Sequence, residues 1–307
     1  MELNQLDRQL LDAIADIKEL PSGAINIRRD GQAIIRRSSS NIKIDADSEK
    51  PGIMVEVKPG TVDEVIHVPV ILTAAGFRDQ VFNTFIIGEG SRVTIIAGCG
   101  IHNSSHSDSR HDGIHKIVVE KGAHLKYQEK HYGEGQGKGK RILNPVTEII
   151  VHDDGAAELE LHQIKGVDDT NRTTVVYLHR RANIKIIERL LTHDNQNAES
   201  DIKIFIQGNK GTAQVFSRTV AKDNSTQVFK ASIMGETECF GHVECDSIIM
   251  DRAKIKSIPE LIAQNSEAVL THEAAIGKIA GEQLIKLMSL GLTEQEAMDT
   301  ILNGFLK

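Results

Sequence analysis

The chain has 307 residues, of which 40% are hydrophobic and 26% are charged, a composition typical of soluble globular proteins. Its formal net charge of −7 argues against nucleic-acid binding, because proteins that bind nucleic acids usually carry a basic surplus. The apolar runs are far shorter than the ~20 residues needed to cross a bilayer, and the acidic N-terminus does not resemble a signal peptide, so we expect a cytoplasmic protein without a membrane partner.

The first predicted element is an amphipathic helix over residues 3–18, followed after Pro21 by strand-like sequence. Its apolar residues recur at helical spacing: Leu3, Leu6, Leu10, Leu11, Ile14 and Ile17. We expect residues 1–50 to form an N-terminal helix and strands that cap the domain that follows.

A weak internal repeat occupies the middle of the chain, from about residue 84 to residue 257. Each unit contains a short β-rich segment, a tight turn and a second segment in which apolar and polar residues alternate, as in strands. The turns are predicted at Gly90, Gly122, Gly155, Ala182, Gly211 and Gly235, a spacing of roughly 24 to 33 residues. Such a period indicates a solenoid or a propeller.

We favour a right-handed parallel β-helix over residues 51–270. A propeller blade needs about four strands in 40 or more residues, whereas each unit here holds about two. Stacked coils bury a continuous apolar column. The low aromatic content, with no tryptophan, suits layers of Ile, Val, Leu and Ala. An irregular β-sandwich made of hairpins is the alternative.

Two helices are predicted within the C-terminal region, residues 271–307. The first covers residues 274–290, where apolar residues lie on one face and Gly291 provides a C-terminal stop. The second starts at Thr293, which forms a Thr-x-x-Glu capping box with Glu296. We therefore expect a helical hairpin at the C-terminal end of the solenoid.

Cys99 begins a polar segment, CGIHNSSHSDSRHDGIH, that also contains His102, His106, His111 and His115. Thiolates and imidazoles are natural ligands of zinc and iron, so Cys99 with one or more of these histidines is a candidate metal or cofactor site. The alternative is a solvated insertion between two coils. The segment GEGQGKGK (133–140) lacks the spacing of a phosphate-binding loop and is predicted to be a mobile basic loop.

The other cysteines, Cys239 and Cys245, lie near the end of the repeat. An odd number of cysteines in a cytoplasmic chain argues against a disulfide framework. His272-Glu273 follows Cys245 by 27 residues, about one repeat, so these residues could lie on neighbouring coils near one edge. A lone cysteine is more often a small core residue, and that alternative stays open.

The C-terminal segment resembles the end of the SufB/SufD family of the SUF system, whose members assemble iron–sulfur clusters. Four motifs carry the resemblance in order, almost without gaps, from Cys245 to Phe305: CDSIIMD, IPELI, HEAAIGKI and GLTEQEAMDTILNGF. The β-helix predicted from the repeat agrees with the fold of this family. Because this shorter chain carries both SufB-like and SufD-like features, it is identified as a short SufBD-like form.

The resemblance implies a non-catalytic scaffold that pairs with itself through its β-helix and docks a SufC-like ABC ATPase on its C-terminal helices. Its cargo would be a transient 4Fe–4S or 2Fe–2S cluster, passed on to apo-proteins. Cys245 matches the SufB-type cysteine that holds the nascent cluster, Glu273 the SufB-type glutamate and His272 the SufD-type interface histidine. Cys99 is a further cluster- or metal-binding candidate, and the secondary ones are His102, His106, His111, His115 and Cys239. The ATPase-docking candidates are Leu284, Leu287, Met288, Ile301 and Phe305.

Two other functions are alternatives for such a solenoid. One is a zinc-dependent hydrolase that uses the histidines of residues 99–115, and the other is a polysaccharide-active enzyme. The sequence lacks the H-E-x-x-H motif typical of the first and the tryptophans that commonly line the groove of the second. The metal that accompanies the purified protein, iron with sulfide or zinc, distinguishes the scaffold from the hydrolase.

Overall fold

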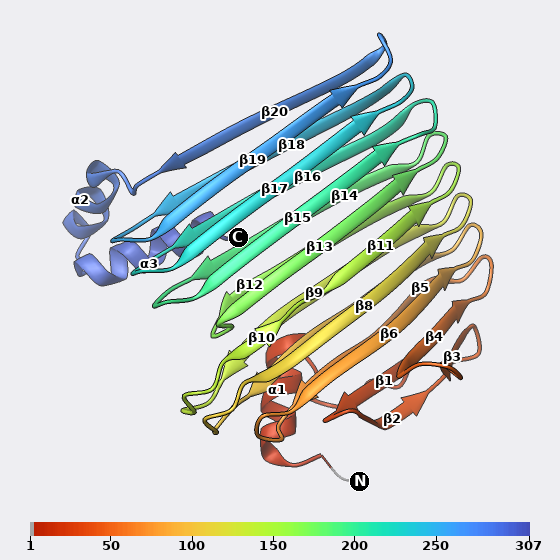
Figure 1. Cartoon of the computed structure of the whole chain (residues 1–307), viewed down its shortest axis with the longest axis horizontal. Coiled ribbons are helices and arrows are strands. Elements are labelled where there is room, and N and C mark those ends of the chain that lie inside the picture. Colours follow the sequence, from red (N-terminus) through yellow and green to blue (C-terminus); the bar gives the residue numbers. More distant parts are fainter. Residues whose placement is uncertain (1–2) are drawn as a thin grey trace.

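Two long β-sheets packed face to face form most of the chain in the computed structural model, which describes residues 3–307 (Figure 1). Sheet A has the strand order β2-β1-β5-β7-β9-β12-β14-β16-β18-β20. Sheet B has the order β19-β17-β15-β13-β10-β8-β6-β4-β3, and β11 pairs with β13 and β8. From β5 onwards the chain alternates between the sheets, so that each coil stacks in parallel on the one before it. About eight coils result, which confirms the predicted β-helix.

The strands of sheet A are β1 (Ala24–Arg29), β2 (Gln32–Arg37), β5 (Val62–Leu72), β7 (Arg92–His102), β9 (His124–Glu134), β12 (Ala156–Lys165), β14 (Asn183–Thr192), β16 (Gly211–Ala221), β18 (Cys239–Ile249) and β20 (Ala268–Gly277). Those of sheet B are β3 (Ile42–Ala46), β4 (Gly52–Val57), β6 (Arg78–Ile87), β8 (Ser109–Val119), β10 (Arg141–Leu143), β11 (Val146–Val151), β13 (Asp169–Leu178), β15 (Asn197–Ile206), β17 (Thr226–Gly235) and β19 (Lys254–Ala263). The helices are α1 (Gln5–Ala15), α2 (Gly281–Ser289) and α3 (Glu294–Phe305).

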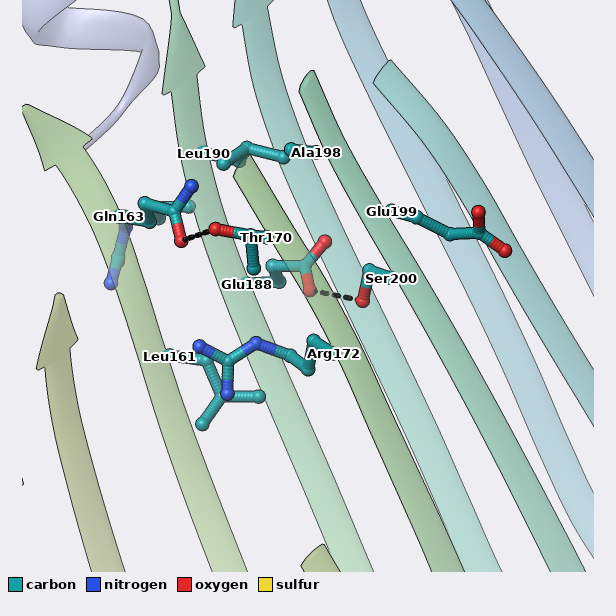
Figure 2. A pocket seen from close by; sticks show the side chains of 10 residues that line it. Leu161, Gln163, Thr170, Arg172, Glu188, Leu190, Ala198, Glu199 and Ser200 are labelled. Carbon is teal, nitrogen blue, oxygen red and sulfur yellow. Dashed lines mark hydrogen bonds between the residues drawn. The ribbon is translucent and has the colours of Figure 1, made fainter. Parts of the chain in front are cut away.

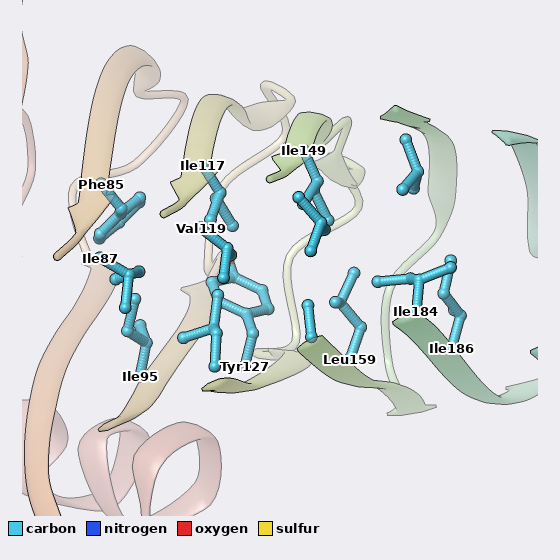
Figure 3. Packing of buried hydrophobic residues seen from close by; sticks show 14 of the residues in the cluster. Phe85, Ile87, Ile95, Ile117, Val119, Tyr127, Ile149, Leu159, Ile184 and Ile186 are labelled. Carbon is cyan, nitrogen blue, oxygen red and sulfur yellow. The ribbon is translucent and has the colours of Figure 1, made fainter. Parts of the chain in front are cut away.

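Columns of aliphatic side chains fill the space between the sheets and repeat from coil to coil (Figure 3). Ile87, Val119, Val151 and Leu178 are successive register partners in one column, and all four are buried. Each such side chain stabilises the fold by about 1.5–3 kcal/mol when it leaves water. The alternating strands of the sequence therefore direct every second residue into the interior, where the largest apolar cluster extends through most of the coils.

The predicted turns match the structure at the first units and miss at the last. Gly90 and Gly122 have φ values of 66° and 64°, a left-handed conformation that glycine adopts without strain. The prediction at Gly235 is wrong, because β17 runs through this residue and pairs it with Ala263 of β19. The chain instead turns over residues 236–238.

At the N-terminus, α1 packs on the outer face of sheet A. Leu10 and Ile14 of α1 lie against Gly98 and Gly100 of β7, and a side chain at Gly98 would collide with the backbone of the helix at Ile14. The end of the solenoid is closed instead by β2 and β3, which pair antiparallel with β1 and β4. The predicted helix is confirmed, and it lies along the side of the first coils (Figure 1).

At the C-terminus, α2 and α3 form a hairpin beside the last coils (Figure 1). The predicted start of the first helix at Ala274 is wrong, because residues 274–277 continue β20 and pair with β18. The predicted capping box is confirmed: Thr293 Oγ1 accepts from the backbone N–H of Glu296, and Glu296 accepts from that of Thr293.

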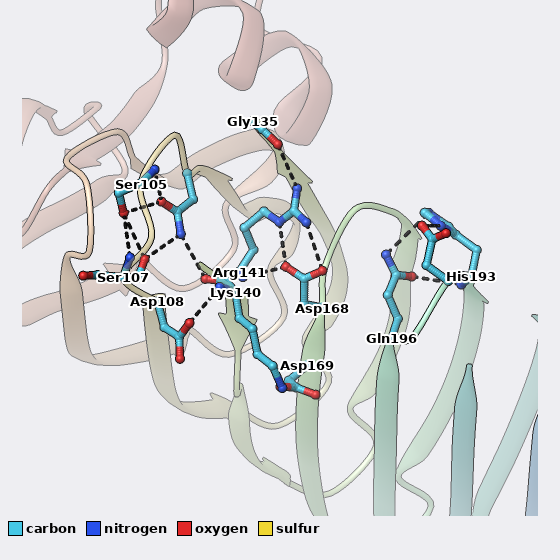
Figure 4. A network of polar contacts seen from close by, with 12 residues as sticks. Ser105, Ser107, Asp108, Gly135, Lys140, Arg141, Asp168, Asp169, His193 and Gln196 are labelled. Carbon is cyan, nitrogen blue, oxygen red and sulfur yellow. Dashed lines mark hydrogen bonds and ion pairs between the residues drawn. The ribbon is translucent and has the colours of Figure 1, made fainter. Parts of the chain in front are cut away.

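Residues 135–140 of the glycine-rich segment form a loop, as predicted, and this loop is hydrogen-bonded to the preceding coil. Gly137 N–H donates to the Asn103 carbonyl oxygen at 3.0 Å, and Gly139 N–H donates to that of Ser105 at 2.9 Å. Lys140 N–H donates to Asp108, and the Lys140 side chain reaches Asp169 one coil further (Figure 4). Small residues are needed here because the two backbones nearly touch.

Candidate functional site

Cys245 points into the solenoid from β18. It is 3% exposed and belongs to the main apolar core. Its Sγ lies 3.1 Å from Ser257 Oγ of β19, and the thiol donates to the backbone carbonyl oxygen of Glu273 at 3.6 Å. Burial raises the pKa of the Cys245 thiol, and the Ser257 contact only partly opposes this effect. The resting side chain is therefore a neutral thiol that bridges the last strands of both sheets.

His272 and Glu273 lie on opposite faces of β20. His272 is the register partner of Val243, whose side chain is buried in the core, so His272 shares the inner face with Cys245. Glu273 is the register partner of Glu244 on the outer face. Because β20 is the last strand of sheet A, both side chains are exposed. The structure thus places Cys245 and His272 on the same face of sheet A and Glu273 on the opposite face.

Cys99 occupies a second buried polar centre, on β7 near the N-terminal end. It is 8% exposed and contacts the imidazoles of His111 and His131. Burial raises the pKa of the Cys99 thiol, but the two histidines outweigh it and lower the pKa to about 7. His111 Nδ1 lies 3.3 Å from Asp79 Oδ2. Asp79 also accepts two hydrogen bonds from the Arg28 guanidinium. At neutral pH this arrangement favours a thiolate beside a protonated histidine.

Next to His131, the buried carboxylate of Glu129 is contacted by three hydrogen-bond donors. His131 Nε2 lies 2.8 Å from Glu129, Arg172 donates to it at 2.8 Å, and Tyr127 donates at 2.9 Å. Burial alone would raise the pKa of Glu129, but these charges and hydrogen bonds hold it well below its usual range. Glu129 and His131 are not among the ligands predicted from the sequence, although alternation in HLKYQEKHY places both on the same face as the apolar Leu125.

Polar side chains continue from this centre along the interior. Arg172 borders a small cavity with Gln163, Thr170 and Glu188, in which Thr170 donates to Gln163 and Ser200 donates to Glu188 (Figure 2). Ser217 also donates to Glu188 at 3.1 Å, and Ser217 is the register partner of Cys245. Buried polar groups therefore extend through the coils between the two cysteines.

The remaining predicted ligands lie apart from one another. His115 is buried beside Asn83, and burial lowers its pKa to about 4. His102 pairs with Glu134 near the surface, and His106 is exposed. Cys239 is buried at the other end of β18, close to Gly235.

Within residues 3–307, one group of three metal-ligating side chains converges: His193, Asp194 and Asp223, with ligand atoms within 4.8 Å of one another. It lies at the turns, where Asp223 already accepts from the backbone N–H of Asp194. Cys245 and Cys99 do not belong to a group of this kind in the described part of the chain. A metal at Cys245 would thus require ligands beyond those that one chain gathers there.

The C-terminal hairpin leaves apolar side chains uncovered. All described side chains of α2 are at least partly exposed, with Ile285 at 69% and Met288 at 42%. Leu284 borders a groove between the hairpin and β18, and Leu287 is half-buried. In α3, Ile301 and Phe305 are half-buried. None of the three helices in residues 3–307 combines the length and the hydropathy that crossing a membrane requires.

The fold and the site define a β-solenoid protein with a buried cysteine in its C-terminal coils and a helical hairpin beside them. Residues 71–305 match the family model described as SUF system FeS cluster assembly, SufBD core domain. The chain therefore belongs to the SufBD family.

Several archaeal relatives are named iron–sulfur cluster assembly SufBD family proteins. The chain is 28% identical to one from Methanothermobacter thermautotrophicus over 85% of its own length and 64% of that protein. It is 28% identical to one from Archaeoglobus fulgidus over 89% of its length and 73% of that protein. A relative from Methanocaldococcus jannaschii is 25% identical, with 100% of this chain and 99% of that protein covered. The first of these proteins is thus considerably longer than this chain.

Proposed function

We propose that this chain is the non-catalytic scaffold subunit of an iron–sulfur cluster assembly complex, which holds a nascent cluster and passes it to apo-proteins. The observation that carries the proposal is the shared inner face of Cys245 and His272 at the C-terminal end of a SufBD-family solenoid. Mixed thiolate and imidazole ligands bind a cluster less firmly than four thiolates, which suits a site that must release its cargo. Three free cysteines are consistent with a reducing compartment such as the cytoplasm.

We further propose that a second copy covers the C-terminal end. Strands β19 and β20 terminate the sheets, so each presents an edge of backbone donors and acceptors that another chain can pair with. Apolar side chains are exposed beside these edges: Ile258 at 36%, Val269 at 56% and Ile276 at 47%. A two-fold interface here would add a second Cys245 and His272, which supplies the ligands that one copy lacks.

The energy for release is proposed to come from an ABC ATPase docked on α2 and α3. The exposed Ile285 and Met288 form an apolar surface on a helix that lacks a complete partner. The docking candidates Leu284, Leu287, Met288, Ile301 and Phe305 belong to the same hairpin. If this surface binds the ATPase, Met288→Glu abolishes co-purification, whereas Gln295→Glu on the exposed start of α3 preserves it.

Cys99 is proposed as a second metal- or cluster-binding thiol. Its two histidine neighbours favour the thiolate that binds metals. His272-Glu273 lies on a strand, so it is not the helical motif of a zinc hydrolase. The metal found in the purified protein tests both points, because a scaffold retains iron with sulfide and a hydrolase retains zinc.

The decisive experiment is anaerobic reconstitution with iron and sulfide in the presence of the ATPase. Cys245→Ser should lose the sulfide-to-iron absorbance, whereas Cys239→Ser, which alters a buried cysteine of the same strand, should retain it. If both variants load equally well, Cys99 becomes the proposed cluster ligand in place of Cys245. Reconstitution of Cys99→Ser then tests that assignment. If the wild type binds only zinc, the scaffold proposal is wrong.

A further inference from the structure

Cys245 faces Ser257 across the interior, and the pair lies between the last strands of the solenoid. The Sγ and Oγ atoms are 3.1 Å apart. The thiol has one proton, which it can donate to the Glu273 carbonyl oxygen, and the Ser257 hydroxyl can then donate to the sulfur. The sulfur is thereby fixed by one contact from β19 and another from β20.

The same position in the solenoid holds a similar pair two coils earlier. In sheet A, Glu188, Ser217 and Cys245 are successive register partners, and in sheet B, Ser200, Phe229 and Ser257 are. Ser200 Oγ donates to Glu188 at 2.6 Å across the interior. In both coils a serine hydroxyl of sheet B therefore lies within hydrogen-bond distance of a possible acceptor on sheet A.

We propose that Ser257 is a positioning residue for Cys245, because its hydroxyl fixes the direction of the sulfur and donates to it when the cluster is bound. The inference rests on the proposed function of Cys245. A metal-bound sulfur has lost its proton, so the Glu273 carbonyl oxygen can no longer accept from it, whereas Ser257 can still donate. Hydrogen bonds to charged acceptors are roughly twice as strong as neutral ones.

The test compares Ser257→Val with Ser257→Thr, two β-branched side chains of nearly equal shape that differ in the hydroxyl. After reconstitution with iron and sulfide, the rate of cluster loss to a chelator and the position of the charge-transfer band are measured. We expect loss from Ser257→Val to be about tenfold faster, with a shifted band, and loss from Ser257→Thr to stay within about twofold of wild type. Ser232→Val is the matched control, because Ser232 lies on the outer face of β17 and contacts Glu260.

A second measurement does not depend on the cluster. In the apo-protein, the rate of Cys245 alkylation relative to Cys239 should change in Ser257→Val and be restored in Ser257→Thr. Equal behaviour of the two variants in both measurements overturns the inference. If Ser257→Val does not fold, Ser257→Ala removes the same hydroxyl without added volume and decides in the same way. Full cluster loading of Cys245→Ser would instead refute the proposed function, whatever the Ser257 variants show.

Discussion

Cys245 and Glu273 lie on adjacent strands of sheet A, yet their side chains project from opposite faces. The register pairs Cys245 with Ala274 and Glu273 with Glu244, so the Cys245 thiol meets the backbone carbonyl oxygen of Glu273 and not its carboxylate. His272 lies on the Cys245 face. One chain therefore presents a thiol and an imidazole on the same face of sheet A, while Glu273 lies on the opposite face.

This geometry predicts different results for the two neighbouring residues of β20. His272→Gln should speed cluster loss to a chelator by about tenfold or more, because it removes the imidazole proposed as a ligand on the Cys245 face. Glu273→Gln should change the rate by less than about threefold, because its carboxylate points outward. Both residues are exposed and both substitutions are conservative, so neither variant should have an appreciably lower melting temperature. The reverse order would mean that β20 shifts by one residue when the cluster binds, since such a slip exchanges the two faces.

Asp79 should make the fold sensitive to acid. Burial alone would raise the pKa of its carboxyl, but His111 and Arg28 outweigh burial and lower the pKa to about 2. A carboxyl with a lowered pKa stabilises the folded state above its unfolded pKa of about 3.9. That contribution, about 2 kcal/mol, is lost as the pH falls through about 2.

Urea unfolding at a series of pH values tests this prediction. Asp79→Asn should be less stable than wild type above about pH 5, and the difference should shrink between about pH 4 and pH 2. Asp45→Asn is the control, because Asp45 forms an exposed ion pair with Lys43, and such pairs contribute little. A pH-independent difference for Asp79→Asn would show that Asp79 acts through packing and not through its charge.

The periodicity of the sequence was sufficient to predict the coils, because alternation determines which residues enter the core. The same periodicity was not sufficient to predict the buried polar residues around Cys99. Glu129 and His131 alternate with apolar neighbours, but charged residues are expected outside, and the compensating Arg172 is 43 residues away in another sheet. Helical spacing of the apolar residues after Ala274 predicts a helix that begins too early, because the ladder with β18 keeps this segment extended.

The Cys99 thiol should titrate near neutrality. Burial opposes its ionisation, but His111 and His131 lower the pKa to about 7, so Cys99 is largely a thiol at pH 6 and largely a thiolate at pH 8. The ultraviolet absorbance of the thiolate, measured as the difference between wild type and Cys99→Ser, should follow this transition. His111→Gln should move the midpoint upward, because it removes the larger of the two histidine effects. Cys245 provides the internal comparison, since burial raises its pKa and Cys245→Ser should leave the signal near pH 7 unchanged.

The docking of α1 should depend on Gly98 much more than on Gly100. A Cβ atom at Gly98 would lie 2.6 Å from the Ile14 carbonyl oxygen and 3.0 Å from that of Lys130, and neither backbone atom can move without displacing an element. A Cβ atom at Gly100 would meet the side chains of Ile14 and Leu10 at 3.4 Å, which is ordinary contact. Gly98→Ala should therefore cost about 2 kcal/mol of unfolding free energy and expose α1 to proteolysis, whereas Gly100→Ala should cost under about 1 kcal/mol. Equal effects would indicate that α1 adjusts its position on sheet A, and that the Cys99 strand tolerates a looser cover.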